Sequence, residues 1–132
     1  MKYAINGMDV PDAFGESSPG TTAGRLVFTS GLVATDPEDD ERLMEGDVTC
    51  QCERIIDLAE VILGEVDCTL EDVAQTTLYV TDLDDLEAID EVYASRFPRP
   101  HPARSVVCVA GLPLGAKVSL QCICISVTDK LL

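Results

Sequence analysis

Residues 116–127 alternate their side chains with a period of two, and this pattern predicts a β-strand. One face of this strand carries Val118, Leu120, Cys122 and Cys124. The other face carries Ser119, Gln121, Ile123, Ile125 and Val127. Because apolar residues lie on both faces, the sheet that contains this strand needs cover on both sides.

The rest of the chain supplies further strands and two helices for such a sheet. Strands are expected at residues 25–30, 32–35, 75–81 and 105–110. Helices are expected over residues 48–63 and between Asp82 and Pro98, where apolar residues recur at steps of three and four. The predicted buried stripe of the second helix consists of Leu86, Ile89, Tyr93 and Phe97. Residues 7–24 are rich in Gly, Pro, Ser and Thr and predict a surface loop, and residues 36–41 predict an acidic turn.

The order of these elements is strand, strand, helix, strand, helix, strand, strand, and a length of 132 residues fits a single domain over residues 1–132. Right-handed strand–helix–strand crossovers place both helices on one face of the sheet. The uncovered face then carries Ile123, Ile125 and Val127, together with Tyr79 or Val80. A half-apolar sheet face seldom stays exposed, so the sequence predicts an oligomer whose subunits cover each other's sheets.

Charge and hydropathy exclude some classes of function. The chain has 24 acidic and nine basic residues and a formal net charge of −15. Nucleic-acid affinity comes mostly from Lys and Arg that neutralise phosphates, so nucleic acid is not an expected partner. There is no apolar run long enough to span a membrane and no signal-peptide core at residues 1–7, so the protein is expected in the cytoplasm and not in a membrane.

The six cysteines and the single histidine do not form a recognisable metal or redox motif. No two cysteines have the Cys-x-x-Cys spacing, and His101 lies among prolines. Without an export signal, reduced and mostly packed thiols are the favoured interpretation, with a metal or redox role as the alternative. His101 is expected to be an ordinary exposed loop histidine.

Arg104 is the strongest candidate for a ligand-binding residue. It follows the rigid stretch Pro-His-Pro-Ala at residues 100–103 and opens a predicted strand. An arginine at the mouth of a sheet can hold a carboxylate through two parallel hydrogen bonds. On the residues alone, an exposed or structurally paired arginine is an equally open interpretation.

Several motifs, in order along the chain, resemble those of the RidA family, also called YjgF or L-PSP endoribonuclease-like. The C-terminal motifs are Pro102-Ala103-Arg104-Ser105 and the run that contains Leu112-Pro113 and Gly115-Ala116. The N-terminal motif is Leu26 to Gly31, and the middle motifs are Thr81 to Asp85 and Val92-Tyr93. The resemblance extends from about Arg25 to Val127.

This resemblance implies a chorismate-mutase-like α+β fold, with a mixed β-sheet and two helices on one face, and a homotrimer with ligand clefts between subunits. It implies hydrolysis of reactive imines and enamines, such as 2-aminoacrylate and 2-iminopropanoate, to a 2-keto acid and ammonia. It also implies that no metal or organic cofactor takes part. The expected partners are therefore a small carboxylate substrate and two further copies of the chain.

The resemblance also assigns site residues. Arg104 matches the arginine that holds the substrate carboxylate, and Asp90 matches a frequent pocket asparagine. Ser30, Gly31 and the backbone at Val106 match positions that line the pocket.

Three positions depart from the family pattern. Gln121 stands where a glutamate helps to position the attacking water, Ser17 stands where a tyrosine occurs, and Val106 replaces a cysteine. A glutamine can accept a hydrogen bond from water but cannot take its proton. The expected function is therefore an imine deaminase that Gln121 weakens or redirects. A non-catalytic trimer that binds small carboxylates, as a sensor or partner-binding protein, is the alternative, and the charge of −15 disfavours an endoribonuclease.

Overall fold

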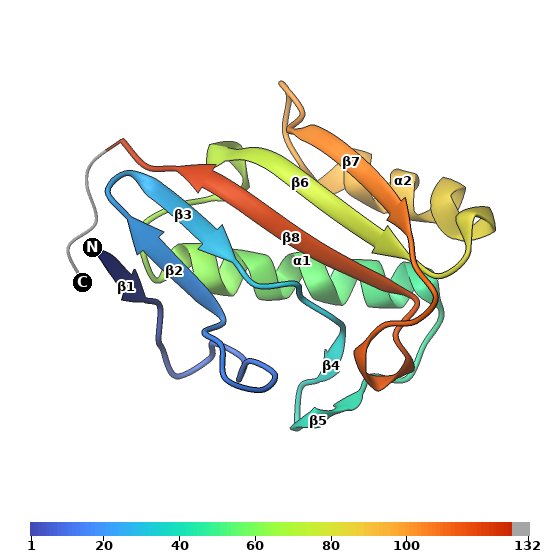
Figure 1. Ribbon diagram of the computed structural model, residues 1–132. Helices are drawn as coiled ribbons and strands as arrows, with labels where there is room; N and C mark the ends of the chain where they lie inside the picture. Colours follow the sequence, from blue (N-terminus) through green and yellow to red (C-terminus); the bar gives the residue numbers. More distant parts are fainter. Residues whose placement is uncertain (128–132) are drawn as a thin grey trace.

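The computed structural model describes residues 1–127, which form one six-stranded sheet with two helices on one face (Figure 1). The strands of this sheet, in spatial order, are β1 (Lys2–Ala4), β2 (Gly20–Ala23), β3 (Leu26–Thr29), β8 (Val118–Ile125), β6 (Val73–Val80) and β7 (Ala103–Cys108). The helices are α1 (Val48–Gly64) and α2 (Leu86–Arg96), and a small hairpin joins β4 (Thr35–Asp36) to β5 (Asp39–Leu43). Short 3-10 turns occupy Leu70–Asp72, Leu83–Asp85 and Pro113–Gly115.

Strand β8 lies in the middle of the sheet and is antiparallel to both of its neighbours, β3 and β6. Strand β7 is parallel to β6, and its other edge is open within residues 1–127. The α+β class, the placement of both helices on one face and the alternation of β8 are confirmed. The buried residues of β8 that face the helices are Val118, Leu120, Cys122 and Cys124.

Helix α1 forms where its apolar stripe and its cap predict it. The carboxylate of Asp47 accepts a hydrogen bond from the N–H of Cys50 at 3.0 Å, which caps the first turn. Its apolar stripe, which includes Ile55, Ile56, Ile62 and Leu63, is buried against the sheet. Gln51 is also buried, and its side-chain oxygen accepts a hydrogen bond from the N–H of Lys117 at 2.9 Å. This contact ties the start of α1 to the residue that precedes β8.

The second helix begins later than its sequence predicts. Asp82 accepts a hydrogen bond from the N–H of Asp84 and caps the 3-10 turn, so α2 itself begins at Leu86. The predicted stripe is buried at Ile89, Tyr93 and Phe97. The two aromatic rings stack with their centroids 4.4 Å apart.

The prediction of a loop over residues 7–24 is wrong for the last residues of that range. Gly20–Ala23 forms strand β2, which pairs with β3 through a tight turn in which Gly24 has φ +58°. Lys2–Ala4 then adds β1 outside it. The Gly- and Thr-rich composition of this segment is typical of a loop, but pairing with the apolar strand that follows determines the conformation of the segment.

The predicted strands and turns near residues 32–41 are also corrected. Leu32 makes a single antiparallel bridge to Leu120, and the regular pairing begins only at Thr35. The acidic segment forms part of the β4–β5 hairpin, because the N–H of Glu38 is held by the carboxylate of Asp36 at 2.8 Å.

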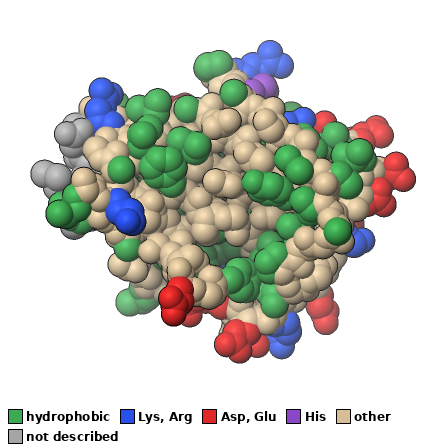
Figure 2. All heavy atoms as spheres, viewed as in Figure 1, with side chains coloured by type: hydrophobic (Ala, Val, Ile, Leu, Met, Phe, Trp, Pro, Cys, Tyr) green, Lys and Arg blue, Asp and Glu red, His purple; other side chains and the backbone are tan. Residues whose placement is uncertain are grey.

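The second face of the sheet remains partly apolar, as the alternation of β8 predicts. Tyr79, not Val80, belongs to this face, because Val80 is buried on the side of the helices. The residues that leave large apolar surface exposed include Leu26 at 41%, Val107 at 40% and Ile125 at 47%. Figure 2 shows hydrophobic side chains distributed over this face, with acidic side chains toward its margin.

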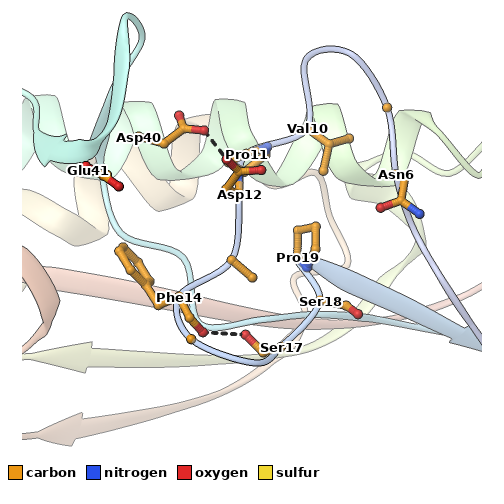
Figure 3. A pocket seen from close by; sticks show the side chains of 13 residues that line it. Asn6, Val10, Pro11, Asp12, Phe14, Ser17, Ser18, Pro19, Asp40 and Glu41 are labelled. Carbon is orange, nitrogen blue, oxygen red and sulfur yellow. Dashed lines mark hydrogen bonds between the residues drawn. The ribbon is translucent and has the colours of Figure 1, made fainter.

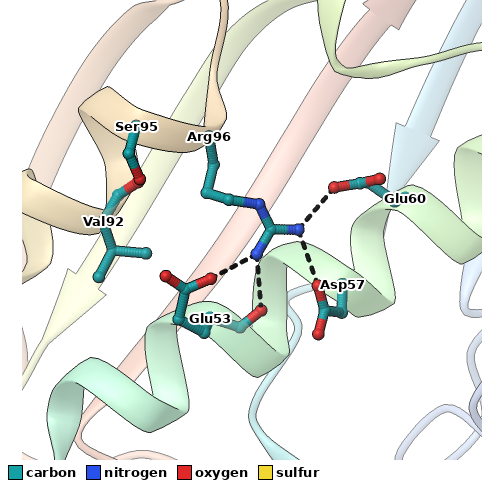
Figure 4. A network of polar contacts seen from close by, with 6 residues as sticks. All are labelled: Glu53, Asp57, Glu60, Val92, Ser95 and Arg96. Carbon is teal, nitrogen blue, oxygen red and sulfur yellow. Dashed lines mark hydrogen bonds and ion pairs between the residues drawn. The ribbon is translucent and has the colours of Figure 1, made fainter.

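Arg96, at the end of α2, joins the two helices through an ion-pair network (Figure 4). Its guanidinium lies 2.5 Å from the carboxylate of Glu53, 2.7 Å from that of Asp57 and 2.6 Å from that of Glu60. Burial alone would lower the pKa of Arg96, but the hydrogen bonds that it donates to the three carboxylates raise this pKa above its ordinary value. The guanidinium therefore also offsets the mutual repulsion of three carboxylates on α1.

We expect Arg96→Met to lower the free energy of unfolding by about 1–2 kcal/mol, because three ion pairs are lost together and three carboxylates remain unpaired. The exposed pair between Arg42 and Asp36, 3.0 Å apart, provides the control: Arg42→Met should leave stability nearly unchanged, because water screens an exposed ion pair. Urea unfolding at one fixed chain concentration measures both variants. Equal losses for the two variants would contradict a structural role for the network.

Candidate functional site

A shallow pocket of about 250 Å³ lies between α2 and the outer strand β7. Its lining residues are Asp90, Tyr93, Ala94, His101, Pro102 and Arg104. Asp90, Tyr93 and Ala94 come from α2, and the other three come from the segment that leads into β7 and from its start. The pocket therefore depends on how β7 docks beside the helix.

Arg104 reaches this pocket because of its register in the sheet. It pairs with Thr76 of the parallel strand β6, and Thr76 is buried on the side of the helices. The guanidinium carbon lies 4.9 Å from the centre of the Tyr93 ring, which is cation–π distance. Its Nη1 donates a hydrogen bond to Asp90 Oδ1 at 2.5 Å. Arg104 is thus held between an aromatic face and a carboxylate, with 25% of its side chain exposed.

Tyr93 is fixed from below by a buried hydrogen bond. Its hydroxyl lies 2.7 Å from the hydroxyl of Thr76, and both residues are buried. Burial raises the pKa of Tyr93, so the phenol stays neutral and can donate this hydrogen bond. The ring therefore provides Arg104 with a support of defined orientation.

The backbone at Val106 faces the open edge of β7. The N–H of Val109 donates to the carbonyl of Val80 on β6 at 2.8 Å. Backbone groups of successive residues point to alternate sides of a strand, so the N–H and C=O of Val106 point away from β6. These groups are available to a ligand or to another chain.

Other predicted site residues lie on the opposite side of the sheet. Gln121 pairs with Thr77 and shares its side with Tyr79, whose hydroxyl donates to the Gln121 side-chain oxygen at 3.5 Å. Gly31 lies near the same face, because a Cβ added to it would be 3.4 Å from the hydroxyl of Ser119. The neighbouring Ser30 donates its N–H to the carbonyl of Pro19 at 2.8 Å.

Ser17 lies in the loop before β2, beside a larger hollow of about 600 Å³ (Figure 3). Its hydroxyl donates to the carbonyl of Phe14 at 2.7 Å. Asp12 and Asp40 also line this hollow, and the N–H of Asp12 donates to the carboxylate of Asp40 at 3.2 Å. Ser17 and Ser30 also line one shallow surface depression.

The structure therefore separates the candidate residues into two groups. Arg104 and Asp90 lie together in the pocket on the helix side. Ser17, Ser30, Gly31 and Gln121 form the second group, on the other face and in the loop beside it. One chain does not bring Arg104 and Gln121 into contact.

Four residues that line the pocket were not among the predicted site residues, and two of them, Tyr93 and His101, have aromatic rings. Tyr93 belongs to the buried stripe of α2, as predicted, but its ring also forms the wall under Arg104. His101 is exposed, as predicted, yet it lines the same pocket with its ring centre 6.5 Å from that of Tyr93. The spacing of Asp90 and Tyr93 is a usable signal, because residues three apart share one side of a helix.

The six cysteines differ in their exposure. Four of them are buried, and Cys50 and Cys108 are exposed. Burial raises the pKa of Cys52 to about 11 and that of Cys122 to about 12, which makes these thiols poor nucleophiles. Within residues 1–127, no three His, Cys, Asp or Glu side chains are grouped as metal ligands would be, and no helix is long and apolar enough to cross a membrane.

Comparison with known proteins identifies the family. The family model described as endoribonuclease L-PSP matches residues 8–126, and the chain belongs to this family, to which the RidA and YjgF proteins also belong. Reactive intermediate deaminase A of Arabidopsis thaliana, a chloroplastic protein, is 36% identical over 122 residues, which are 92% of this chain and 65% of the plant protein. The chain thus spans just under two thirds of the plant protein's length.

Two further relatives match over nearly their whole length. Human 2-iminobutanoate/2-iminopropanoate deaminase is 26% identical over 125 residues, which are 95% of this chain and 90% of the human protein. The crystal structure of RidA from an Antarctic Psychrobacter superposes with a TM-score of 0.87 and 32% identity, covering 93% of this chain and 98% of that one. These similarities confirm the RidA-like α+β fold that the resemblance implies.

The pair formed by Thr76 and Tyr93 supports the pocket, and a double-mutant cycle tests its energy. We expect Tyr93→Phe to lower the free energy of unfolding by about 1–2 kcal/mol, because the buried Thr76 hydroxyl loses its partner. Adding Thr76→Val should recover most of this loss, because both polar groups are then replaced by apolar ones. Urea unfolding of the two single variants and the double variant gives the coupling. Additive losses would show that the two hydroxyls do not stabilise each other.

Proposed function

We propose that this protein hydrolyses reactive 2-imino acids and their enamines, such as 2-iminopropanoate and 2-aminoacrylate, to a 2-keto acid and ammonia. The observation that carries the proposal is the arginine pocket, in which Arg104 is oriented by the Tyr93 ring and by Asp90 at 2.5 Å. A fixed guanidinium is suited to a planar carboxylate, which every 2-imino acid carries. The names of the plant and human relatives support the same class of reaction.

The reaction needs a held substrate and a positioned water. Water adds its oxygen to the carbon of the C=N bond, the nitrogen takes up protons, and the C–N bond then breaks to release ammonia and leave the keto group. Holding the carboxylate and the water together lowers the entropic part of the barrier. The Gln121 amide oxygen can accept a hydrogen bond from that water. The backbone of Gly31 and Val106 and the carbonyl of Ser30 can bind water or the imine nitrogen. No metal or organic cofactor has a role in this scheme.

We propose that the working unit is a homotrimer with clefts between subunits. The two groups of candidate residues lie on different faces of one chain, so a complete site needs an Arg104 group from one subunit and a Gln121 group from another. The half-apolar sheet face, with Leu26, Val107 and Ile125 exposed, supports burial between copies of the chain. The open backbone edge at Val106 belongs to the same proposed interface.

RNA cleavage, which the family description names, is not part of this proposal. The chain carries a net charge of −15, which repels a phosphate backbone. The arginine pocket also contains only one Lys or Arg among its lining residues, whereas nucleic-acid affinity needs several such groups to neutralise phosphates. RNA cleavage that survives purification and is lost in Arg104→Ala would overturn this choice.

We expect Arg104→Ala to reduce kcat/KM for freshly generated 2-iminopropanoate at least about 100-fold, because the carboxylate loses a bidentate, charged partner. Arg42→Ala, which removes an exposed arginine elsewhere, should behave like the wild type. Ammonia and 2-keto acid release, corrected for the uncatalysed rate, measures the effect. Equal rates for the wild type and Arg104→Ala would disprove the proposal. Binding of a 2-keto acid at Arg104 without turnover would instead favour a carboxylate-binding protein.

We expect Gln121→Glu to raise kcat about tenfold or more with a smaller change in KM, because a carboxylate can take the proton that an amide cannot. Thr77→Ser, which changes the cross-strand neighbour of Gln121 but not the charge, is the control. Steady-state kinetics at neutral pH separates kcat from KM. An unchanged or lower kcat would show that no proton acceptor at residue 121 limits the reaction.

A further inference from the structure

The arginine pocket contains a feature that a simple carboxylate clamp does not need. Asp90 lies in the pocket with 46% of its side chain exposed and points one oxygen at Arg104 Nη1, 2.5 Å away. The guanidinium of Arg104 therefore already has a carboxylate on one side. A ligand with a single carboxylate must bind beside an anion that has the same charge.

The guanidinium can nevertheless hold two carboxylates at once. It has five N–H donors in a planar fork, and Asp90 takes a hydrogen bond from Nη1 alone. The edge formed by Nε and Nη2 has no hydrogen-bond partner within residues 1–127. A ligand carboxylate can bind that edge in bidentate fashion while Asp90 keeps its place.

The remainder of such a ligand then lies in a pocket that contains the free oxygen of Asp90. His101 and Tyr93 form the rest of the polar lining, and Asp90 is the one carboxylate among the six lining residues. A neutral alkyl group gains nothing from Asp90, and a second carboxylate is repelled by it. A positively charged group gains a charge-assisted hydrogen bond.

We propose that Asp90 determines specificity and selects 2-imino acids that carry a positively charged end, the kind that oxidation of a basic amino acid produces. This inference rests on the proposed function for the identity of the reacting group, but the selection itself acts on binding. Asp90 serves as a binding residue that contacts the cationic end, while Arg104 holds the carboxylate.

The test uses three stable 2-keto acids in place of the short-lived imines. The probes are 5-guanidino-2-oxopentanoate, which has a cationic end, 2-oxobutanoate, which has a neutral end, and 2-oxoglutarate, which has an anionic end. Isothermal titration calorimetry gives Kd for each with the full-length wild type. We expect the order of affinity to be cationic, then neutral, then anionic.

The decisive variant is Asp90→Asn, which keeps an acceptor for Arg104 but removes the charge. We expect the affinity for the cationic probe, relative to that for the neutral probe, to fall about tenfold in this variant, which is equivalent to about 1.4 kcal/mol. Glu91→Gln is the matched control, because it removes one negative charge from the next residue of α2, which is exposed. This control should leave the ratio unchanged.

The outcomes separate this inference from the proposed function. A shifted ratio in Asp90→Asn alone supports the inference, even if no imine is hydrolysed. An unchanged ratio, an equal shift in Glu91→Gln, or no binding of any probe to the wild type overturns it. If Arg104-dependent deamination is observed while the ratio stays unchanged, the proposed function stands and the selection by Asp90 is wrong.

Discussion

The structure depends on the pairing of β8 with β3 and β6 in the middle of the sheet. This pairing sends Leu120 and Cys122 into the core against α1 and leaves Gln121 on the opposite face. A shift of one residue would exchange the two faces and bury a polar amide in the core, so the register is strongly specified. The register of this strand also fixes the face of the sheet on which the candidate residues of the neighbouring strands lie.

The arginine pocket is a consequence of the parallel pairing between β6 and β7. It brings Arg104 beside Thr76, and Thr76 holds the Tyr93 ring on which the guanidinium rests. A guanidinium that is partly buried needs compensation, and the ring and the Asp90 carboxylate provide it. The same carboxylate that stabilises Arg104 also changes which ligands suit it, so structural support and selectivity come from one residue.

Sequence patterns predicted the elements that have a strong period and missed those that depend on pairing. The apolar stripes of α1 and α2 and the alternation of β8 were found, because burial of one side imposes a period on the chain. Strand β2 was missed because its Gly and Thr residues become a strand only beside β3. The proline-rich residues before Arg104 indicated this arginine as a candidate. The contact of the Tyr93 ring with its guanidinium was not predicted, because this contact joins distant parts of the chain.

The sequence by itself determined the α+β class, the two helices on one face, the uncovered apolar face and the identity of the candidate arginine. The helices and the apolar face follow from local periodicity, the α+β class follows from the family motifs, and the arginine follows from its own chemistry. The tertiary structure alone decided that Asp90 pairs with Arg104 and that Gln121 lies on the other face of the sheet. Such relations are set by strand register and helix docking, which bring together residues far apart in the chain. The local sequence pattern around each residue therefore carries no signal of the contact.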